Sequence, residues 1–249
     1  MFSDSPDLKI GTEIEILGRY LYCNNWNVDD ALKNIHDYYD FKNKYPDWIT
    51  NDQTPDDFEE IYNLNTRILL PHTDKQGKFI VVHKIVDAFN DIENYNIKLV
   101  QLDDLIYESV LSSPRGQQYG ITTILDTEGI NRNYIKYYTP SIATLIGKKC
   151  DIMPIRLEDK RAHFLIKNAL ISSLLSLILP FLGCLKKLAI FHKSSNLEKL
   201  KEYIGKENLP YEYGGSQMNS FDSSYLKEFL RARYSYVKQS QKYYKKDTD

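Results

Sequence analysis

The sequence lacks the short motifs that mark the common catalytic sites. It contains no GxSxG, GxxxxGK[ST], GxGxxG or HExxH pattern, which argues against a serine-hydrolase elbow, a phosphate-binding loop, a dinucleotide fold and a zinc protease. The best carboxylate pair, Asp126 and Glu128, follows a strand-like run. General acid–base catalysis of glycoside hydrolysis needs two carboxylates that face one cleft, and no partner motif accompanies this pair. We interpret it as turn-forming, and the sequence predicts no catalytic residue and no enzyme.

Cysteine and histidine are scarce. The three cysteines, Cys23, Cys150 and Cys184, have no CxxC spacing, and residues 1–11 contain no apolar leader. We expect a reducing compartment, with each cysteine a small core side chain. The histidines are His36, His72, His83, His163 and His192. Their spacing fits no metal site, so we expect no metal and no cofactor. In strand-like runs, His83 and His163 are expected to be core residues satisfied by a hydrogen bond.

An excess of charge of one sign is also missing. The chain has 32 Lys and Arg against 34 Asp and Glu, which leaves a formal net charge of −2. Nothing therefore attracts the chain as a whole to nucleic acid or to an anionic membrane. We expect a cytoplasmic monomer without a nucleic-acid partner. The basic group at Lys242, Lys245 and Lys246 is interpreted as a solvated tail.

The sequence does contain one uncharged apolar run, ALISSLLSLILPFLGCL at 169–185, bracketed by Lys167, Lys186 and Lys187. A membrane span needs roughly 20 apolar residues, and Pro180 interrupts this shorter run. A membrane span, a buried core helix and a lid with one face on an oily ligand and another on a membrane all remain open. Strand-like runs on both sides favour a lid lying on a sheet.

A helical projection of the run separates its side chains. At about 100° per residue, Ser172, Ser173 and Ser176 share one stripe. The apolar side chains on the opposite side are Leu170, Ile171, Leu174, Leu177 and Ile178. The projection therefore predicts that the serines form the less hydrophobic face of the helix.

Residues 1–66 predict a small helical domain. A short helix is expected at 14–21, and Asn27 is a good N-cap for a helix that begins at Val28 and ends before Pro46. A further short helix is expected near 58–64.

From residue 67 the pattern becomes an alternation of strands and helices. Strands are expected at 79–83, 121–126, 162–166 and 188–191, and helices at 97–111, 131–146, 169–182 and 196–204. The run at 68–71 is expected to lead into a turn, 113–120 to form a loop, and Pro140 to kink its helix. This order predicts an α/β domain at 67–215. A helical tail at 216–249, packed loosely or in part, completes the chain.

Four stretches together resemble the CRAL-TRIO lipid-binding family: GITTILDTEG (120–129), YYTPS (137–141), the HFLI to LPFL block (163–182) and LPYEYGG (209–215). The resemblance covers roughly residues 15–215. It implies an α/β lobe whose mixed, mostly parallel sheet is covered by helices and preceded by a small all-helical N-terminal domain, here shortened. One hydrophobic ligand would lie under a gate helix at about 169–182, which swings open at a membrane.

By the same resemblance, the ligand would be lined by Ile121, Leu125, Tyr138, Ile142, Ile146, Phe164, Ile166, Leu170, Leu174, Ile178 and Leu182. Arg156 matches one basic position of the family's phosphoinositide cleft, Lys160 or Arg161 would match a second, and Lys186 or Lys187 a third. Departures weaken that cleft: Leu179 replaces a lysine, Tyr22-Cys23-Asn24 replaces an arginine-rich motif, and a further basic position falls on Leu188 or Ala189.

The sequence therefore predicts an intracellular carrier for one hydrophobic molecule of retinoid, tocopherol, terpenoid or phospholipid type. It would contact membranes transiently during exchange, with phosphoinositide as a further candidate partner. The alternative is a lipid-sensing adaptor that recruits a protein partner through its tyrosine-rich tail.

Overall fold

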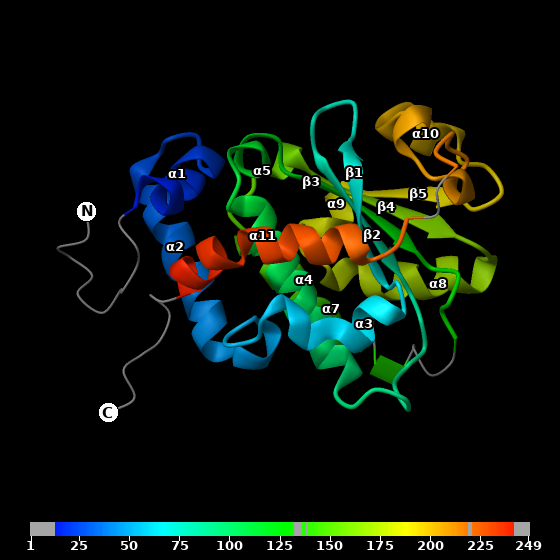
Figure 1. Ribbon diagram of the computed structural model, residues 1–249, viewed down its shortest axis with the longest axis horizontal. Helices are drawn as coiled ribbons and strands as arrows, with labels where there is room; N and C mark the ends of the chain where they lie inside the picture. The colour runs from blue at the N-terminus through cyan, green and yellow to red at the C-terminus, as the bar shows by residue number, and fades with distance from the viewer. Residues whose placement is uncertain (1–12, 132–135, 138, 219–220, 242–249) are drawn as a thin grey trace.

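The computed structural model describes residues 13–131, 136–137, 139–218 and 221–241. Its centre is a five-stranded sheet with the order β1-β2-β3-β4-β5, and helices cover both faces (Figure 1). Only the β1–β2 pair is antiparallel, while β2 to β5 run parallel. The expected fold, a mixed and mostly parallel sheet preceded by helices, is confirmed.

The strands are β1 (Arg67–Thr73), β2 (Phe79–Lys84), β3 (Ile121–Asp126), β4 (Lys160–Ile166) and β5 (Ala189–Lys193). The run expected to lead into a turn is instead the edge strand β1. Pro71 sits in it where the register shifts between Leu69 and Thr73. Proline cannot donate to a ladder and is tolerated at an edge or a bulge, which is why the sequence pattern concealed this strand.

The sheet has an apolar layer on each face, because successive side chains of a strand point to opposite sides. On one face the strand residues Ile80, Val82 and Ile124 pack against Leu200 and Ile204. These last two come from α10 (Glu198–Ile204). The opposite face packs on the helices that carry the site. Burial on both faces accounts for the nearly continuous β-branched runs from which the strands were predicted.

The N-terminal part forms α1 (Ile14–Cys23), α2 (Val28–Lys44), η1 (Pro46–Trp48), η2 (Pro55–Phe58) and α3 (Glu59–Asn63). The predicted cap is confirmed: the Asn27 side chain accepts hydrogen bonds from the backbone of Asp29 and Asp30. Tyr20, Ala31 and Ile35 are buried between α1 and α2.

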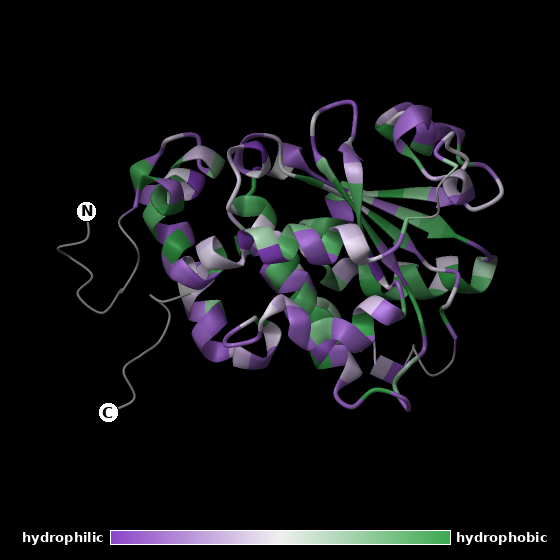
Figure 2. Ribbon diagram, in the orientation of Figure 1, coloured by the Kyte–Doolittle hydropathy of each residue, from purple (hydrophilic) through white to green (hydrophobic). Residues whose placement is uncertain are grey.

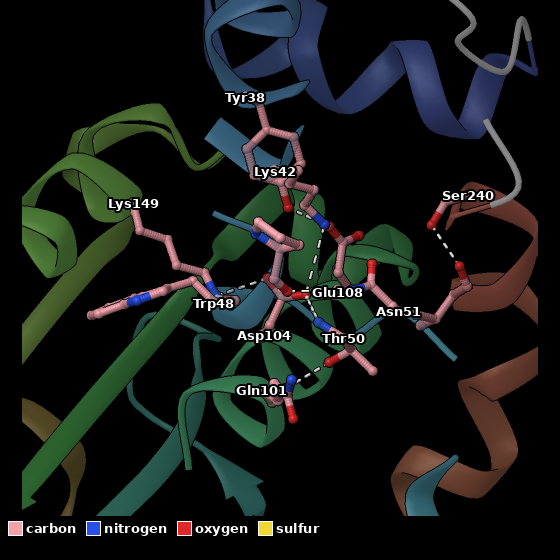
Figure 3. A network of polar contacts seen from close by, with 12 residues as sticks. Tyr38, Lys42, Trp48, Thr50, Asn51, Gln101, Asp104, Glu108, Lys149 and Ser240 are labelled. Carbon is pink, nitrogen blue, oxygen red and sulfur yellow. Dashed lines mark hydrogen bonds and ion pairs between the residues drawn. The ribbon is translucent and has the colours of Figure 1, made fainter. Parts of the chain in front are cut away.

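A buried polar network joins these helices to the lobe (Figure 3). On α4 (Tyr95–Leu111), Glu108 accepts from Arg19 at 2.9 Å and from Lys42 at 2.8 Å. Burial opposes ionisation of Glu108, but the two cations outweigh it and hold the pKa of the carboxyl well below its usual range. One turn earlier, Asp104 lies 2.8 Å from Lys149 of α7 (Pro140–Ile152). The network therefore connects α1, α2, α4 and α7.

Two local expectations after α4 were wrong. The predicted loop at 113–120 contains α5 (Pro114–Tyr119), with Ser113 as N-cap and proline in the first turn. Pro140 does not kink a helix but begins one, α7 (Pro140–Ile152), which Thr139 caps. Proline fits the first turn because the backbone N–H there has no intrahelical partner. Much of the helix predicted before Pro140 lies outside the described residues.

The C-terminal helix, α11 (Ser224–Gln241), is packed on one face, which agrees with the expectation of partial packing and not with that of loose packing. It crosses in front of α4 in Figure 1 and contacts both α4 and β1. Leu226, Leu230 and Val237 are at most 1% exposed. Arg231 also forms an ion pair with Asp56 at 2.5 Å. The basic group at 242–246 lies outside the described residues.

The remaining elements are η3 (Leu157–Asp159), α8 (Ala169–Ile178), η4 (Leu179–Phe181), α9 (Leu185–Leu188), η5 (Lys206–Asn208) and η6 (Tyr211–Tyr213). The apolar run at 169–185 thus becomes two short helices and a connecting turn. It lies between β4 and β5 along the chain, as the crossover prediction required.

Candidate functional site

The apolar run forms α8 because both of its ends carry the expected signals. The Asn168 side chain accepts the N–H of Ile171 at 3.0 Å, and Pro180 lies in the η4 turn that ends the α-helix. Among the described residues, no helix combines the length and apolar character needed to cross a bilayer.

The inner face of α8 covers β4, next to the edge strand β5. Ile171 and Leu175 are 3% and 7% exposed and pack with Ala162 and Phe164 of β4. Partly buried side chains complete the cluster: Leu125, Ile130, Ile166, Ile178, Leu185 and Ala189. We call this set of residues the α8 cluster. Hydrophobic side chains of this kind make up most of the lining of a site for a hydrophobic ligand.

The outer face of α8 is unusually apolar for an exposed surface. Leu170 and Leu177 are 65% and 70% exposed, and Phe181 in η4 is 43% exposed. The three serines of the run are also exposed. In Figure 2, α8 is mostly green although it lies at the side of the molecule.

The structure brings together some of the predicted ligand-lining residues and separates others. Leu125, Phe164, Ile166 and Ile178 are members of the α8 cluster. Three more of the predicted residues are half-buried: Ile142 and Ile146 on α7, and Leu174 on α8. Leu182 is 5% exposed just after η4, at the close approach between that turn and α7.

The other predicted positions lie elsewhere. Ile121 belongs to a separate core cluster, which also holds Leu99 and Leu102 of α4. Leu170 is on the outer face, and Tyr138 lies outside the described residues. The sequence analysis missed Leu175 as an inner residue. The serine stripe could not have indicated it, because at about 100° per residue Leu175 lies roughly as far from the direction opposite the serines as the exposed Leu170 does.

The C-terminal end of the apolar run is fastened to α7. A Cβ placed on Gly147 would lie 2.6 Å from the carbonyl carbon of Leu182, so the two backbones meet there. The Asp151 carboxylate accepts the N–H of Cys184 at 2.7 Å. The sulfur atoms of Cys150 and Cys184 are 3.1 Å apart. The expectation of isolated core cysteines is therefore wrong for this pair, since both side chains are partly exposed and in contact.

The predicted phosphoinositide residues are engaged to different degrees. Arg156 forms ion pairs with Glu158 and Asp159. Lys160 is 6% exposed and donates to the carbonyl oxygens of Cys150 at 2.5 Å and Met153 at 3.3 Å. Lys160 thus neutralises the C-terminal end of α7, where a cation is favoured by the helix dipole.

The other three basic positions are at the same end of β4 and β5. Arg161 donates to the carbonyl oxygen of Lys160 at 2.8 Å. Lys186 and Lys187 are exposed on α9, directly before β5. These last two side chains are the basic groups best presented to solvent beside the apolar run.

Two surface hollows lie away from the α8 cluster. One of about 300 Å³ lies between α2 and α7 and includes Asp37, Lys44 and Lys148 in its lining. The other, of about 740 Å³, is lined by residues 194–198 and 211–215 together with Lys201 and Lys206. Their linings are rich in charged and hydroxyl groups and include none of the predicted ligand-lining residues. Chemistry therefore favours the α8 cluster over either hollow.

A histidine pair lies on the opposite face of the sheet. His163 Nδ1 and His192 Nε2 are 2.9 Å apart, which confirms His163 as a hydrogen-bonded core residue. Burial, helped by His192 and Arg161, lowers the pKa of His163 to about 3. Within the described ranges, no group of three or more His, Cys, Asp or Glu side chains is arranged to hold a metal ion.

His83 departs from the same expectation. It is 9% exposed, but its Nε2 atom has no hydrogen-bond partner in the part of the chain that the structure describes. The nearest carboxylate, Asp103, is 3.7 Å away. Burial lowers the pKa of His83 to about 4.

The comparisons with known proteins agree with this geometry. The alpha-tocopherol transfer protein-like protein of Mus musculus is 26% identical over 241 residues, covering 94% of this chain and 67% of the relative. The Homo sapiens protein of the same name is 27% identical over 218 residues, or 85% of this chain and 61% of its own length. Clavesin-1 of Rattus norvegicus is 25% identical and is covered over 61% of its length. The chain thus spans about two thirds or less of these relatives.

A solved structure shares the fold. The crystal structure of Sfh5 matches with a TM-score of 0.54 at 13% identity, over 83% of this chain and 72% of that one. The CRAL/TRIO domain model matches residues 66–215, which is more than half of the chain and includes all five strands and the helices between them, from α4 to α10. The protein belongs to the CRAL/TRIO domain family.

Proposed function

We propose that this protein binds one hydrophobic small molecule beneath α8 and carries it between membranes, with α8 and η4 as the gate. The observation that carries the proposal is the two-sided apolar character of α8. Its inner face covers the hydrophobic α8 cluster, and its outer face exposes Leu170 and Leu177 beside the three serines, with Phe181 exposed in η4. An ordinary surface helix would carry charged side chains on its outer face, and α8 has no charged residue.

Apolar burial supplies part of the binding free energy of such a carrier. Removing ~300 Å² of apolar ligand surface from water contributes roughly 7 kcal/mol before association costs are subtracted. Micromolar binding requires about 8 kcal/mol net, so a larger ligand surface or polar contacts in the pocket must supply the rest. The ligand would take the place of contacts between α8 and the sheet, which requires α8 to move outward.

The outer face supplies a reason for that movement to occur at a membrane. Leu170, Leu177 and Phe181 would enter the interface, and Lys186 and Lys187 would meet anionic headgroups, at ~1 kcal/mol for each lysine. The protein would therefore be a cytoplasmic carrier, peripheral to membranes during exchange. Because Arg156 and Lys160 already have partners, phosphoinositide would assist docking and would not be required for exchange.

Native mass spectrometry of the protein from its own cells, followed by organic extraction, tests the proposal. A single co-purifying retinoid, tocopherol, terpenoid or phospholipid is expected. Vesicle-to-vesicle transfer of a fluorescent analogue of that lipid then measures carriage. An empty protein that also binds no analogue of these four classes would refute the carrier function and leave the adaptor as the better interpretation.

A further inference from the structure

We propose that Cys150 and Cys184 form a thiol-modification site, which peroxides oxidise to a disulfide that fixes the end of the gate to α7. The effect on exchange rests on the proposed carrier function, whereas the chemistry of the site does not. Cys150 lies in the last turn of α7, and Cys184 lies between η4 and α9, 34 residues later.

The geometry brings the two sulfurs together through contacts that do not involve them. Gly147, Cys150 and Asp151 share one face of α7 at spacings of three and four residues. On that face Gly147 admits the backbone after η4, and Asp151 accepts the N–H of Cys184. The sulfurs are then 3.1 Å apart, about 1 Å more than a disulfide bond. A small side-chain movement is therefore enough for bonding.

Their surroundings make one sulfur the better nucleophile. All three cysteines are free thiols. The hydrogen bond between the two sulfurs lowers the pKa of Cys150, with further help from Lys160, and raises the pKa of Cys184. Burial raises the pKa of Cys23 to about 11. Because the thiolate is the reactive form, Cys23 is the natural internal control for the pair.

The reaction balances with a peroxide as oxidant. The Cys150 thiolate attacks one peroxide oxygen, the O–O bond breaks, and the departing hydroxide is protonated to water, which leaves a sulfenic acid on Cys150. Cys184 then attacks the sulfur of Cys150 and displaces hydroxide, which takes the Cys184 proton as a second water. Two thiols and one hydrogen peroxide thus give one disulfide and two waters, and a reducing thiol reverses the step.

The position of the disulfide gives it a mechanical consequence. The chain between Cys150 and Cys184 contains β4, all of α8 and η4. Oxidation would close this segment into a covalent loop that begins at Cys150 on α7. The α7 helix is in turn held to α4 by the ion pair between Lys149 and Asp104. The gate would then keep its C-terminal end in place, and opening would be restricted to the end near Asn168.

The first experiment tests the site without any lipid. The purified chain is treated with hydrogen peroxide and mapped by peptide mass spectrometry, beside Cys150→Ser, Cys184→Ser and Cys23→Ser variants. We expect a Cys150–Cys184 linked peptide in the wild type and in Cys23→Ser, and sulfenic acid trapped only at Cys150 in Cys184→Ser. Loss of the linked peptide on reduction is also expected. Absence of the linked peptide, or equal oxidation of Cys23, would overturn the site.

The second experiment tests the tether. Hydrogen exchange of peptides from 169–184 is compared between the oxidised and reduced wild type, which needs no variant and no ligand. Slower exchange near η4 in the oxidised form is expected, and unchanged exchange would overturn the tether. Lipid transfer by the oxidised form should be slower by about tenfold, because opening limits exchange. If the reduced protein transfers no lipid while the disulfide still forms, the carrier function fails and the thiol site stands.

Discussion

Glu108→Gln tests whether the buried polar network holds the N-terminal helices on the lobe. The Glu108 carboxylate is 1% exposed and accepts hydrogen bonds from Arg19, Lys42 and the hydroxyl of Tyr38. Glutamine has nearly the same shape, but it carries no charge and presents an N–H₂ group where a second acceptor oxygen was. The substitution therefore removes the charge that both cations share and leaves the packing almost unchanged.

The expected loss follows from burial. Removing one partner of a buried ion pair costs about 3–5 kcal/mol, because the remaining charge stays in a poorly solvated site. Asp104 lies 3.7 Å from Lys42 and remains to offset part of that cost. We therefore expect the free energy of unfolding to fall by about 3 kcal/mol, at the lower end of the range.

Urea denaturation at neutral pH measures the loss, and Glu60→Gln is the matched control. Glu60 also pairs with a lysine of α4, Lys98, at 2.5 Å, but its side chain is 59% exposed. Exposed pairs contribute about 0–1 kcal/mol, so the same chemical change should have little effect there.

The pH dependence of the free energy of unfolding is a second test of the role of Glu108. Since the folded-state pKa of Glu108 is depressed, its contribution is complete above the unfolded pKa of about 4.5 and is lost as pH falls below it. The stability difference between the wild type and Glu108→Gln should therefore shrink in acid. Equal effects of the two glutamine variants, or a difference that does not change with pH, would refute the reasoning.

Three further predictions address the gate and the core. Gly147→Ala should lower the free energy of unfolding by about 1–3 kcal/mol, measured by thermal or urea unfolding, because its Cβ would overlap the backbone after η4. In Gly18→Ala of α1 the new Cβ has no neighbour within 4 Å, so this variant should be more stable than the wild type by about 0.5–1 kcal/mol. Leu177→Asp should change the free energy of unfolding by no more than about 0.5 kcal/mol and weaken vesicle binding about tenfold. The control Ser173→Asp adds the same charge to the exposed side of α8 and should weaken vesicle binding less. Equal losses of vesicle binding in the two variants would contradict an apolar contact with the membrane. The pKa of His83 is lowered to about 4 in the folded state, so its contribution is present above about pH 6.5 and is lost as pH falls toward 4, by up to about 3 kcal/mol. His83→Gln should therefore flatten the acid side of the stability profile, and an unchanged slope would show that this histidine does not control it.

Much of the fold could be predicted because its signals are local. The strands β2 to β4 were recognisable as short apolar runs because most of their side chains are buried on both faces, and β5 was recognisable as an apolar run although Phe191 is exposed. Asn27 identified the start of α2. The end of the apolar helix was predicted less well, because it was expected to run to residue 182 and it ends at Ile178, two residues before Pro180. The family resemblance depended on four short stretches in a fixed order along the chain. Each of these signals involves only residues that lie within a few positions of one another in the sequence.

The position of α8 in the site required the tertiary structure. The sequence predicted a helix with an apolar side opposite three serines, but not how far that helix would be rotated on the sheet. Packing against Phe164 turns Ile171 and Leu175 inward and leaves Leu170 and Leu177 outside. Rotation about the helix axis is decided by the shape of the surface beneath it, which a single segment does not encode.

The sequence by itself determined the α/β architecture, the helix caps, the apolar crossover and the family. Only the tertiary structure decided the contacts between distant residues: Arg19 with Glu108, His163 with His192, and Cys150 with Cys184, which are 89, 29 and 34 residues apart. Helical and strand patterns repeat over two to four residues and are visible in a line of letters. Contacts across the fold depend on sheet register and on close backbone approach, and these exist only once the chain has packed.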